Sequence, residues 1–361
     1  MPSLAYALAF TIVAAACGKS PSASAPDASA DAASADTAAQ VPRLRVSGSQ
    51  ILGPDDNPIQ LRGYNWGEWR QWLPTDGADN VADGANVVRI PLRWWGQWRP
   101  DVDSYDPSPD NPTHLDGQHL TDLDTAIQQA ASDHLWIVLF IDSNNGQGAD
   151  SFGDNFFSGT ATGQAMREEF KTVWTTIATR YKDQPWLGAL EILPEPRPLN
   201  VQDPDIRAFY DEMIAAIRAV DTRTPIIVGG QDAYSPKTLE GAFPSSDPNV
   251  IFTADYFIFD PEQATPTDRN HYLTDFMSAH NVPVWINQVS INTGDGTDGF
   301  TPEKTSAGTL LQTFDAENIG WTWWTYREDT TNVTHHGVYI RDAQNNWIEK
   351  GDWRSFIATY F

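Results

Sequence analysis

One stretch of the chain reads LWIVLFI over residues 135–141, and a long amphipathic segment follows it over residues 163–181. A second apolar run, LGALEIL, comes next over residues 187–193. Apolar runs of this length are typical of strands buried on both faces, and the segment between them is typical of a helix. A strand, a helix and a second strand in this order are the building unit of a parallel sheet.

The same alternation continues along most of the chain. The other predicted strands are short apolar runs at residues 62–64, 86–90, 225–228, 250–254, 282–289 and 320–325. The other clear helices fall at residues 121–132, 205–220, 267–279 and 303–315. Eight strands within a domain of about 300 residues favour an α/β fold of the closed (β/α)₈ type, a TIM barrel.

An open, doubly wound sheet is the alternative fold. Such a sheet usually carries a glycine-rich phosphate turn after its first strand. Here that position holds the aromatic sequence Gly63-Tyr64-Asn65-Trp66-Gly67, which lacks the required glycine spacing. We therefore expect the closed barrel. A short β-hairpin should precede it, with strands at residues 44–46 and 58–62 around turn-forming residues 53–57.

The first 42 residues differ from the rest in composition. An apolar run over residues 4–16 has the length of a signal-peptide core and is too short to span a bilayer. It ends at Cys17, the only cysteine, in Ala14-Ala15-Ala16-Cys17, which resembles a bacterial lipobox although leucine is usual at the first position. Residues 18–42 are rich in Ser, Ala, Pro and Asp, which is typical of a flexible linker.

These features predict a signal peptide over residues 1–17, a linker over 18–42 and one barrel domain over 43–361. We expect an exported bacterial protein, periplasmic or on the cell surface, with a lipid on Cys17 as its membrane contact. An ordinary signal peptide with an incidental cysteine is the alternative.

Charge and composition narrow the classes of function. The chain has 361 residues and a formal net charge of −25, which disfavours binding to nucleic acid or to anionic membranes. It contains 15 tryptophans, whose rings can stack on sugars as well as fill a core. No P-loop, HExxH, GxSxG or metal-spaced Cys/His motif is present, so we expect neither a cofactor nor a metal.

The active site of a (β/α)₈ barrel lies at the carboxyl ends of its strands. At these positions the chain carries polar and aromatic side chains, a combination that suits a sugar. In chain order they are Trp66, Arg89, Asp142, Glu195, Asp255, Gln288, Trp324 and Tyr326.

Five fragments, in order along residues 43–361, resemble glycoside hydrolase family 5, the cellulase-like retaining barrels. They are Leu61-Arg62-Gly63-Tyr64-Asn65-Trp66, Asn86-Val87-Val88-Arg89-Ile90-Pro91, Glu191-Ile192-Leu193-Pro194-Glu195-Pro196, Pro283-Val284-Trp285-Ile286-Asn287-Gln288 and Gly320-Trp321-Thr322-Trp323-Trp324. The resemblance implies a hydrolase of β-linked polysaccharides or oligosaccharides of the glucan or mannan class. We expect it to act as a monomer.

The resemblance also implies roles for individual residues. The family uses one glutamate after strand 4 as acid/base and another after strand 7 as nucleophile, with carboxyl groups about 5 to 5.5 Å apart. Glu195 matches the acid/base, although Pro194 replaces the usual asparagine that binds the sugar 2-hydroxyl. Arg89 matches the arginine beneath the nucleophile, where a buried salt bridge is equally expected, and Trp324 matches a sugar platform.

The nucleophile position carries Gln288, a neutral amide that cannot replace a carboxylate. Three accounts are open. A second carboxylate could come from Asp142, Asp255 or Glu328. Gln288 could instead hold a substrate acetamido group that acts as its own nucleophile, with Glu195 as acid. The chain could also be a non-catalytic glycan-binding protein on the same scaffold.

Overall fold

A computed structural model describes residues 41–67, 69–94, 106, 108–142, 153–198, 202–258, 269–291, 300–332 and 335–361. The predicted signal peptide and nearly all of the predicted linker lie outside the described residues. None of the helices in these ranges combines the length and the apolar character that a membrane crossing requires.

The central element is a closed barrel of parallel strands in the order β10-β3-β4-β5-β6-β7-β8-β9. The strands are β3 (Arg62–Asn65), β4 (Val87–Arg93), β5 (Trp136–Asp142), β6 (Leu187–Glu191), β7 (Ile226–Gly229), β8 (Val250–Ile258), β9 (Val284–Ile291) and β10 (Gly320–Trp323). Every predicted strand is present, with ends within a few residues of the prediction. The predicted TIM barrel is therefore confirmed.

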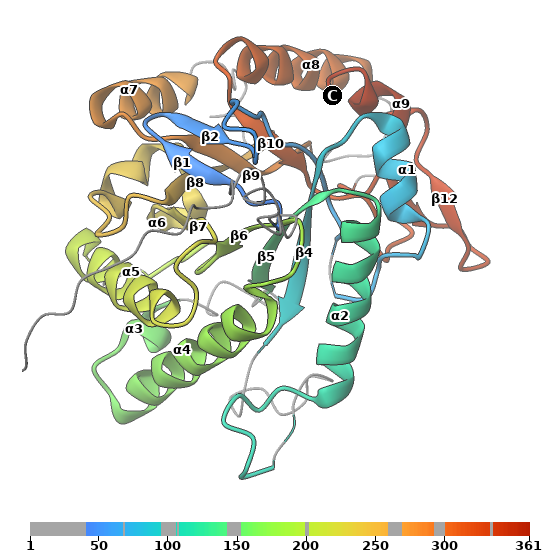
Figure 1. Ribbon diagram of the computed structural model, residues 1–361. Helices are drawn as coiled ribbons and strands as arrows, with labels where there is room; N and C mark the ends of the chain where they lie inside the picture. The colour runs from blue at the N-terminus through green and yellow to red at the C-terminus, as the bar shows by residue number, and fades with distance from the viewer. Residues whose placement is uncertain are drawn as a thin grey trace, which may run out of the picture. The chain divides into compact units, whose positions relative to one another are not determined.

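Helices form an outer ring around this barrel (Figure 1). They are α1 (Asp76–Asp83), α2 (Gly117–Ser132), α3 (Asp154–Phe157), α4 (Ala161–Tyr181), α5 (Asp203–Arg218), α6 (Gln231–Tyr234), the 3₁₀ helix η2 (Pro236–Ala242), α7 (Asn270–His280), α8 (Phe300–Ala316) and α9 (Trp353–Ala358). The predicted helices correspond to α2, α4, α5, α7 and α8. The others are short, so that their apolar periodicity is hard to detect from sequence.

Local signals mark where several helices begin. The Asp116 side chain accepts a hydrogen bond from the backbone N–H of Gln118 at the start of α2. Thr160 does the same for Gly163 at the start of α4. Such caps satisfy backbone donors that have no partner within the helix, and they stabilise it by about 1 kcal/mol each.

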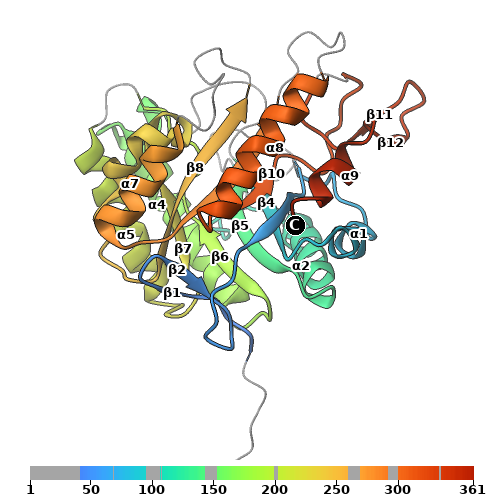
Figure 2. The same ribbon diagram turned by 90° about the horizontal axis from the view of Figure 1, so that it is seen from above.

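The N-terminal hairpin is present, but its second strand was predicted in the wrong place. β1 (Arg45–Ser47) pairs antiparallel with β2 (Gln50–Leu52) around Gly48. Gly48 has a φ of 57°, which glycine adopts without strain, and this allows a tighter turn than the predicted one. Residues 53–57 form a second turn after β2. Figure 2 shows the hairpin at one end of the barrel.

An apolar layer fills this end of the barrel. Leu44 and Ile51, from the hairpin region, pack with inward-facing strand side chains. These are Val87, Trp136, Val138, Ala189, Ile227, Ile251 and Trp285. Burial of each such large side chain stabilises the fold by about 1.5–3 kcal/mol. A second and larger cluster lies between the strands and the helices. The polar side chains at the other end of the barrel therefore stand on a packed floor.

A small antiparallel ribbon follows the barrel, made of β11 (Tyr339–Arg341) and β12 (Trp347–Glu349). In Figures 1 and 2 it extends away from the barrel beside α9. The loop between β10 and this ribbon is fixed by Arg327, which bonds both oxygens of the buried Asp76 at 2.8 and 2.6 Å. This ion pair holds the segment after β10 against α1.

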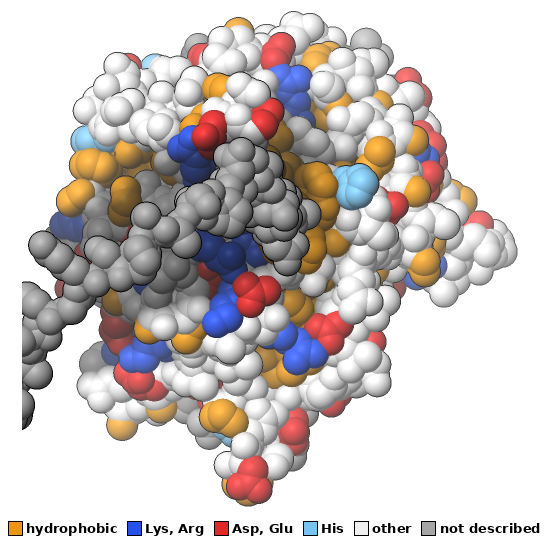
Figure 3. Space-filling model, viewed as in Figure 1, with side chains coloured by type: hydrophobic (Ala, Val, Ile, Leu, Met, Phe, Trp, Pro, Cys, Tyr) orange, Lys and Arg blue, Asp and Glu red, His pale blue; other side chains and the backbone are white. Residues whose placement is uncertain are grey.

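The hairpin end of the molecule faces the viewer in Figure 3. Basic and acidic side chains lie next to one another on this face. Arg218 and Asp247 form one ion pair of 2.6 Å, and Arg223 and Asp183 form another of the same length. The carboxyl ends of the strands lie at the opposite end.

Candidate active site

Glu195 lies just beyond the end of β6. Its φ is 50°, a left-handed conformation that is uncommon for a residue with a side chain and is disfavoured before a proline such as Pro196. The hydroxyl group of Tyr234 donates a hydrogen bond to the Leu193 carbonyl, and the Ala233 N–H donates to the Pro196 carbonyl at 3.2 Å. Backbone strain that neighbouring groups hold in place is characteristic of functional sites.

The turn that supports Glu195 follows β7. Asp232, Ala233 and Tyr234 are all left-handed, with φ between 53° and 56°. A β-carbon on Gly229 would overlap the Tyr234 ring, so that only glycine leaves room for this turn. Sequence analysis assigned no role to Tyr234, because its contact with Leu193 joins two strand ends that are distant in the chain.

Gln288, on β9, reaches the same place. Its Nε2 donates a hydrogen bond of 3.0 Å to Oε1 of Glu195, and Nη2 of Arg197 donates one of 3.3 Å to Oε2. The Glu195 side chain is 24% exposed, whereas Gln288 is 4% exposed. The structure thus brings together the two residues that the sequence singled out.

Asp255, on β8, stands opposite Gln288 in the strand register. The pairing of β8 with β9 shifts between Thr253 and Asp255, and such a bulge re-aims a side chain. Burial raises the pKa of Asp255 well above its ordinary value, and repulsion from the nearby Glu195 carboxylate raises it further. The site therefore contains two neighbouring carboxyl groups in different environments.

A buried polar layer lies between this site and the apolar floor. Arg89 bonds both carboxylate oxygens of Glu191, at 2.6 and 2.8 Å, and donates to Oδ1 of Asn65 at 2.8 Å. Nδ2 of Asn287 donates to Glu191 at 2.9 Å. All four side chains are inaccessible to solvent. Through Glu191, the network connects Asn287, the residue before Gln288 in the chain, with Arg89 in the barrel interior.

The predicted buried salt bridge of Arg89 is confirmed, with Glu191 as its partner. The prediction that Arg89 contacts the substrate is wrong. Its guanidinium group is fully buried and its nitrogen atoms already bond Glu191 and Asn65. Arg89 can therefore affect the site only through the polar layer.

The strand-end aromatic residues divide into two groups. Trp324 is partly exposed, whereas its neighbour Trp323 is buried and packs on Trp353 of α9 with ring centroids 5.5 Å apart. This agrees with the expectation that one of the two faces the helices. Trp324 is thus the aromatic side chain of this pair that a ligand can reach.

The predicted sugar contacts of Trp66 and Tyr326 are wrong. Trp66 is 1% exposed, and its Nε1 donates to Asn80 of α1 at 2.8 Å. Tyr326 is fully buried and packs on Tyr64 with ring centroids 4.8 Å apart. Both rings belong to the apolar core between strands and helices, where a sugar cannot reach them.

Two further candidate carboxylates have different positions. Asp142 is the last residue of β5, and its side chain lies outside the described residues. Glu328 accepts a hydrogen bond from the Gly337 N–H at 2.8 Å and lies 2.9 Å from Nδ1 of His335. Its carboxylate therefore organises its own loop. Of the two carboxylates whose side chains are described, Asp255 is the one beside Glu195.

A serine and a histidine form another pair above Gln288. Oγ of the buried Ser290 lies 3.0 Å from Nδ1 of His336, whose ring meets Phe257 edge-on at 5.4 Å. Sequence analysis missed this pair. The position of Ser290 on the strand of Gln288 was the available signal, but its partner lies 46 residues away in a loop.

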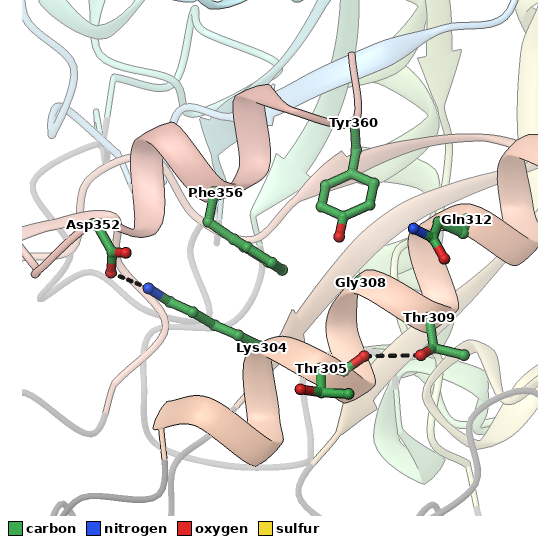
Figure 4. A pocket seen from close by; sticks show the side chains of 8 residues that line it. All are labelled: Lys304, Thr305, Gly308, Thr309, Gln312, Asp352, Phe356 and Tyr360. Carbon is green, nitrogen blue, oxygen red and sulfur yellow. Dashed lines mark hydrogen bonds and ion pairs between the residues drawn. The ribbon is translucent and has the colours of Figure 1, made fainter.

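A separate pocket of about 580 Å³ lies between α8 and α9 (Figure 4). Its lining residues are Lys304, Thr305, Gly308, Thr309, Gln312, Asp352, Phe356 and Tyr360. Figure 4 shows the ion pair of Lys304 with Asp352 at one end of it. None of these residues comes from a barrel strand, so the pocket is not part of the candidate site. Within the described ranges, no group of three or more His, Cys, Asp or Glu residues could hold a metal.

Comparison with known proteins adds an independent line of argument. The profile of the family described as Cellulase (glycosyl hydrolase family 5) matches residues 52–330. Endoglucanase E-5 of Thermobifida fusca is 24% identical over 80% of this chain and 56% of its own length, so the chain spans little more than half of that relative. Beta-xylosidase of Phanerodontia chrysosporium is 21% identical over 79% of this chain and 71% of its own. Mannan endo-1,4-beta-mannosidase 5 of Arabidopsis thaliana is 22% identical over 54% and 50%, respectively.

Solved structures show the same fold. Endoglucanase Cel5A from Thermotoga maritima superimposes with a TM-score of 0.63 at 18% identity, covering 82% of this chain and 96% of that one. The catalytic domain of Thermobifida fusca endoglucanase Cel5A gives 0.62 at 18% identity, covering 88% and 97%. The family profile extends over most of the barrel and includes the strand ends that carry Glu195 and Gln288. The chain belongs to the cellulase family, glycosyl hydrolase family 5.

Proposed function

We propose that this protein is a glycoside hydrolase that cleaves β-linked glucans or mannans, with Glu195 as general acid/base. One observation carries the proposal: Glu195 is held in a strained backbone conformation, beside a second carboxyl group, at the carboxyl end of the barrel. Relatives named as an endoglucanase and a mannosidase support the substrate class. So do structures of Thermotoga maritima Cel5A with mannotriose and with cellobiose.

The chemistry follows from the position of Glu195. A general acid must reach the glycosidic oxygen within hydrogen-bond distance, and the carboxyl group of Glu195 is 24% exposed, so a bound sugar can contact it. Trp324 offers a ring face for the sugar. Gln288 has no carboxylate that could form a covalent intermediate. We propose that Asp255, beside Glu195, is the second carboxyl group of this site without being a nucleophile.

The second candidate function is glycan binding without cleavage. The neutral side chain at position 288 favours it, since the ordinary retaining mechanism of the family needs a carboxylate there. Glycan binding would need Trp324 and the polar groups around it, but not the proton on Glu195.

The test is an assay of new reducing ends with the full chain on soluble β-glucans, mannans and N-acetylhexosamine glycosides. We expect cleavage of a β-glucan or a mannan, and a loss of about 10²–10⁴-fold in Glu195→Gln. Asp275→Asn, at an exposed position on the outer helix α7, is the matched control and should retain activity. An inactive wild-type protein that still binds oligosaccharides in calorimetry would establish the glycan-binding function instead. Cleavage of only the N-acetylhexosamine glycosides would favour the substrate-assisted mechanism.

We also propose that the protein is exported and lipid-anchored through Cys17. The apolar run before Cys17 and the linker-like composition after it support this proposal. Metabolic labelling with a radioactive fatty acid in a bacterial host should label the wild-type protein and not Cys17→Ala. Equal labelling of both would contradict the lipid anchor.

A further inference from the structure

Asp255 is a buried carboxyl group without a hydrogen-bond donor. It is 6% exposed, and neither of its oxygens accepts a hydrogen bond from any described residue. Buried polar groups in proteins are nearly always hydrogen-bonded, and an ionised carboxylate without a donor is strongly unfavourable. The neutral, protonated form avoids this cost because it is itself a donor and needs only an acceptor.

The charged groups around Asp255 also oppose its ionisation. Glu195 and Glu191 approach from β6 and the loop after it, and Arg89 approaches from β4. Arg89 cannot serve as its ion-pair partner, because it already bonds Glu191 and Asn65. Two carboxylates, Glu195 and Glu191, therefore oppose a negative charge on Asp255. The guanidinium group of Arg89 favours that charge, but it is already bonded to other residues. Two nearby donors are directed elsewhere. Gln288 faces Asp255 from β9 but donates its amide N–H to Glu195. The hydroxyl group of Tyr234 donates to the backbone carbonyl of Leu193.

Glu195 is in the opposite situation. Its oxygens receive hydrogen bonds from Gln288 and from Arg197. Two neighbouring carboxyl groups can form a hydrogen bond to each other only when one of them carries a proton. The donors around Glu195 and the absence of described donors around Asp255 assign that proton to Asp255.

We propose that Asp255 and Glu195 share one proton, and that Asp255 is the positioning residue that stores it for Glu195. This inference rests on the proposed hydrolase function. The raised pKa of Asp255, caused first by burial and then by the charge of Glu195, is consistent with it.

The proton would move in two transfers. Arg197 is 49% exposed and can leave Glu195 when a sugar enters, which removes one donor from the carboxylate. The proton then passes from Asp255 to Glu195, and from Glu195 to the glycosidic oxygen. That oxygen takes the electron pair of its bond to the anomeric carbon. Water supplies a hydroxyl group to the anomeric carbon, and its remaining proton restores the carboxyl pair.

The first test does not depend on activity. If Asp255 is protonated in the folded protein, its pKa is higher in the folded state than in the unfolded state. Between these two pKa values the folded state binds one more proton, so the free energy of unfolding falls as pH rises. We therefore expect the urea midpoint of Asp255→Asn to rise relative to that of the wild type between about pH 4 and pH 8. Asp275→Asn, on the outer helix α7, should show no such trend.

The role of Glu195 is tested in the same titration. In a Glu195→Gln background, the stabilising effect of Asp255→Asn should depend less on pH, because the neighbouring negative charge has been removed. A midpoint difference that does not change with pH, or one that falls as pH rises, would overturn the proposal. Infrared detection of a protonated carboxylic acid in the wild type near pH 7, absent from Asp255→Asn, is a second readout. If that variant does not fold, a wild-type band that disappears with a midpoint below pH 6 as the pH is raised would overturn the proposal.

The second test uses the pH profile of kcat/KM on a substrate that the wild type cleaves. In Asp255→Asn, the basic limb of this profile should move by about one pH unit to lower pH. At a fixed pH on that limb, kcat/KM should fall about tenfold, while KM stays nearly unchanged. A purely structural role would lower activity equally at all pH values. If the protein cleaves no glycan, the proposed function fails, and the stability titration alone decides whether the two carboxyl groups share a proton.

Discussion

Nε2 of Gln288 donates a hydrogen bond of 3.0 Å to Oε1 of Glu195. Gln288, at the position where the sequence predicts the nucleophile of the family, is therefore a donor that orients the carboxyl group of Glu195. This contact gives Gln288 a positioning role that is independent of any role as a nucleophile.

Gln288→Glu should destabilise the protein in a pH-dependent manner. The change removes a donor and places a third carboxyl group beside Glu195 and Asp255, so the pKa of the new glutamate should be raised. The free energy of unfolding should be near that of the wild type at about pH 4 and lower by about 1–3 kcal/mol at pH 8, measured by urea unfolding.

Gln312→Glu, at an exposed position on α8, is the control for an added charge. An equal effect of the two variants at pH 8 would contradict the structural reason given for Gln288. The reducing-end assay of Gln288→Glu gives separate information. A gain in cleavage would show that the scaffold still supports the ordinary mechanism of the family.

Arg89→Met should destabilise the barrel by about 3–5 kcal/mol, because it leaves the buried Glu191 carboxylate without its partner. The double variant Arg89→Met/Glu191→Gln removes the charge as well, and it should recover part of this loss. Chemical denaturation of the wild type, both single variants and the double variant completes the cycle. If the double variant is no more stable than Arg89→Met, the pair is not the reason for the loss.

Trp323 and Trp324 form a matched pair of neighbours on opposite faces of one segment. Trp323→Ala should lower the free energy of unfolding by about 3–5 kcal/mol, because Trp323 is buried against Trp353. Trp324→Ala should cost less stability but weaken oligosaccharide binding by about 1.4 kcal/mol or more, a tenfold change in Kd. Thermal unfolding and calorimetric titration distinguish the two effects. Unchanged binding in folded Trp324→Ala would exclude Trp324 as the sugar platform.

Tyr234→Phe should lower kcat with little change in KM. It removes the hydroxyl group that bonds the Leu193 carbonyl and supports the loop of Glu195, and displacement of a catalytic group by about 1 Å can cost about 100-fold in rate. Tyr181→Phe, which loses a 2.7 Å hydrogen bond to Asp124 on the outer helices, is the control and should affect stability only. Equal kcat losses in the two variants would point to a general loss of stability.

Gly229→Ala tests the same turn from the other side. The added β-carbon would overlap the Tyr234 ring, so we expect a loss of stability together with a loss of activity. Overpacking of a tight interior costs about 1–3 kcal/mol. A variant with wild-type stability would show that the turn can rearrange without affecting Glu195.

Sequence alone was sufficient for the barrel and for much of its outer ring. The strands are short apolar runs and the long helices carry caps and amphipathic patterns, and these are local signals. Glu195 and Gln288 could be assigned to strand ends for the same reason, since the position of a residue relative to a strand is a local property. The parallel order of the strands then requires their carboxyl ends to lie at one end of the barrel.

Which side chains meet at that end was decided by the tertiary structure. Barrel strands are buried on both faces, so alternation did not show that Trp66 points toward the helices while Trp324 remains accessible. Arg89 lies 102 residues from Glu191, and no local pattern links them. Asp255 faces Gln288 only because the register of β8 against β9 shifts, and a shift of one residue reverses the face on which every later side chain lies.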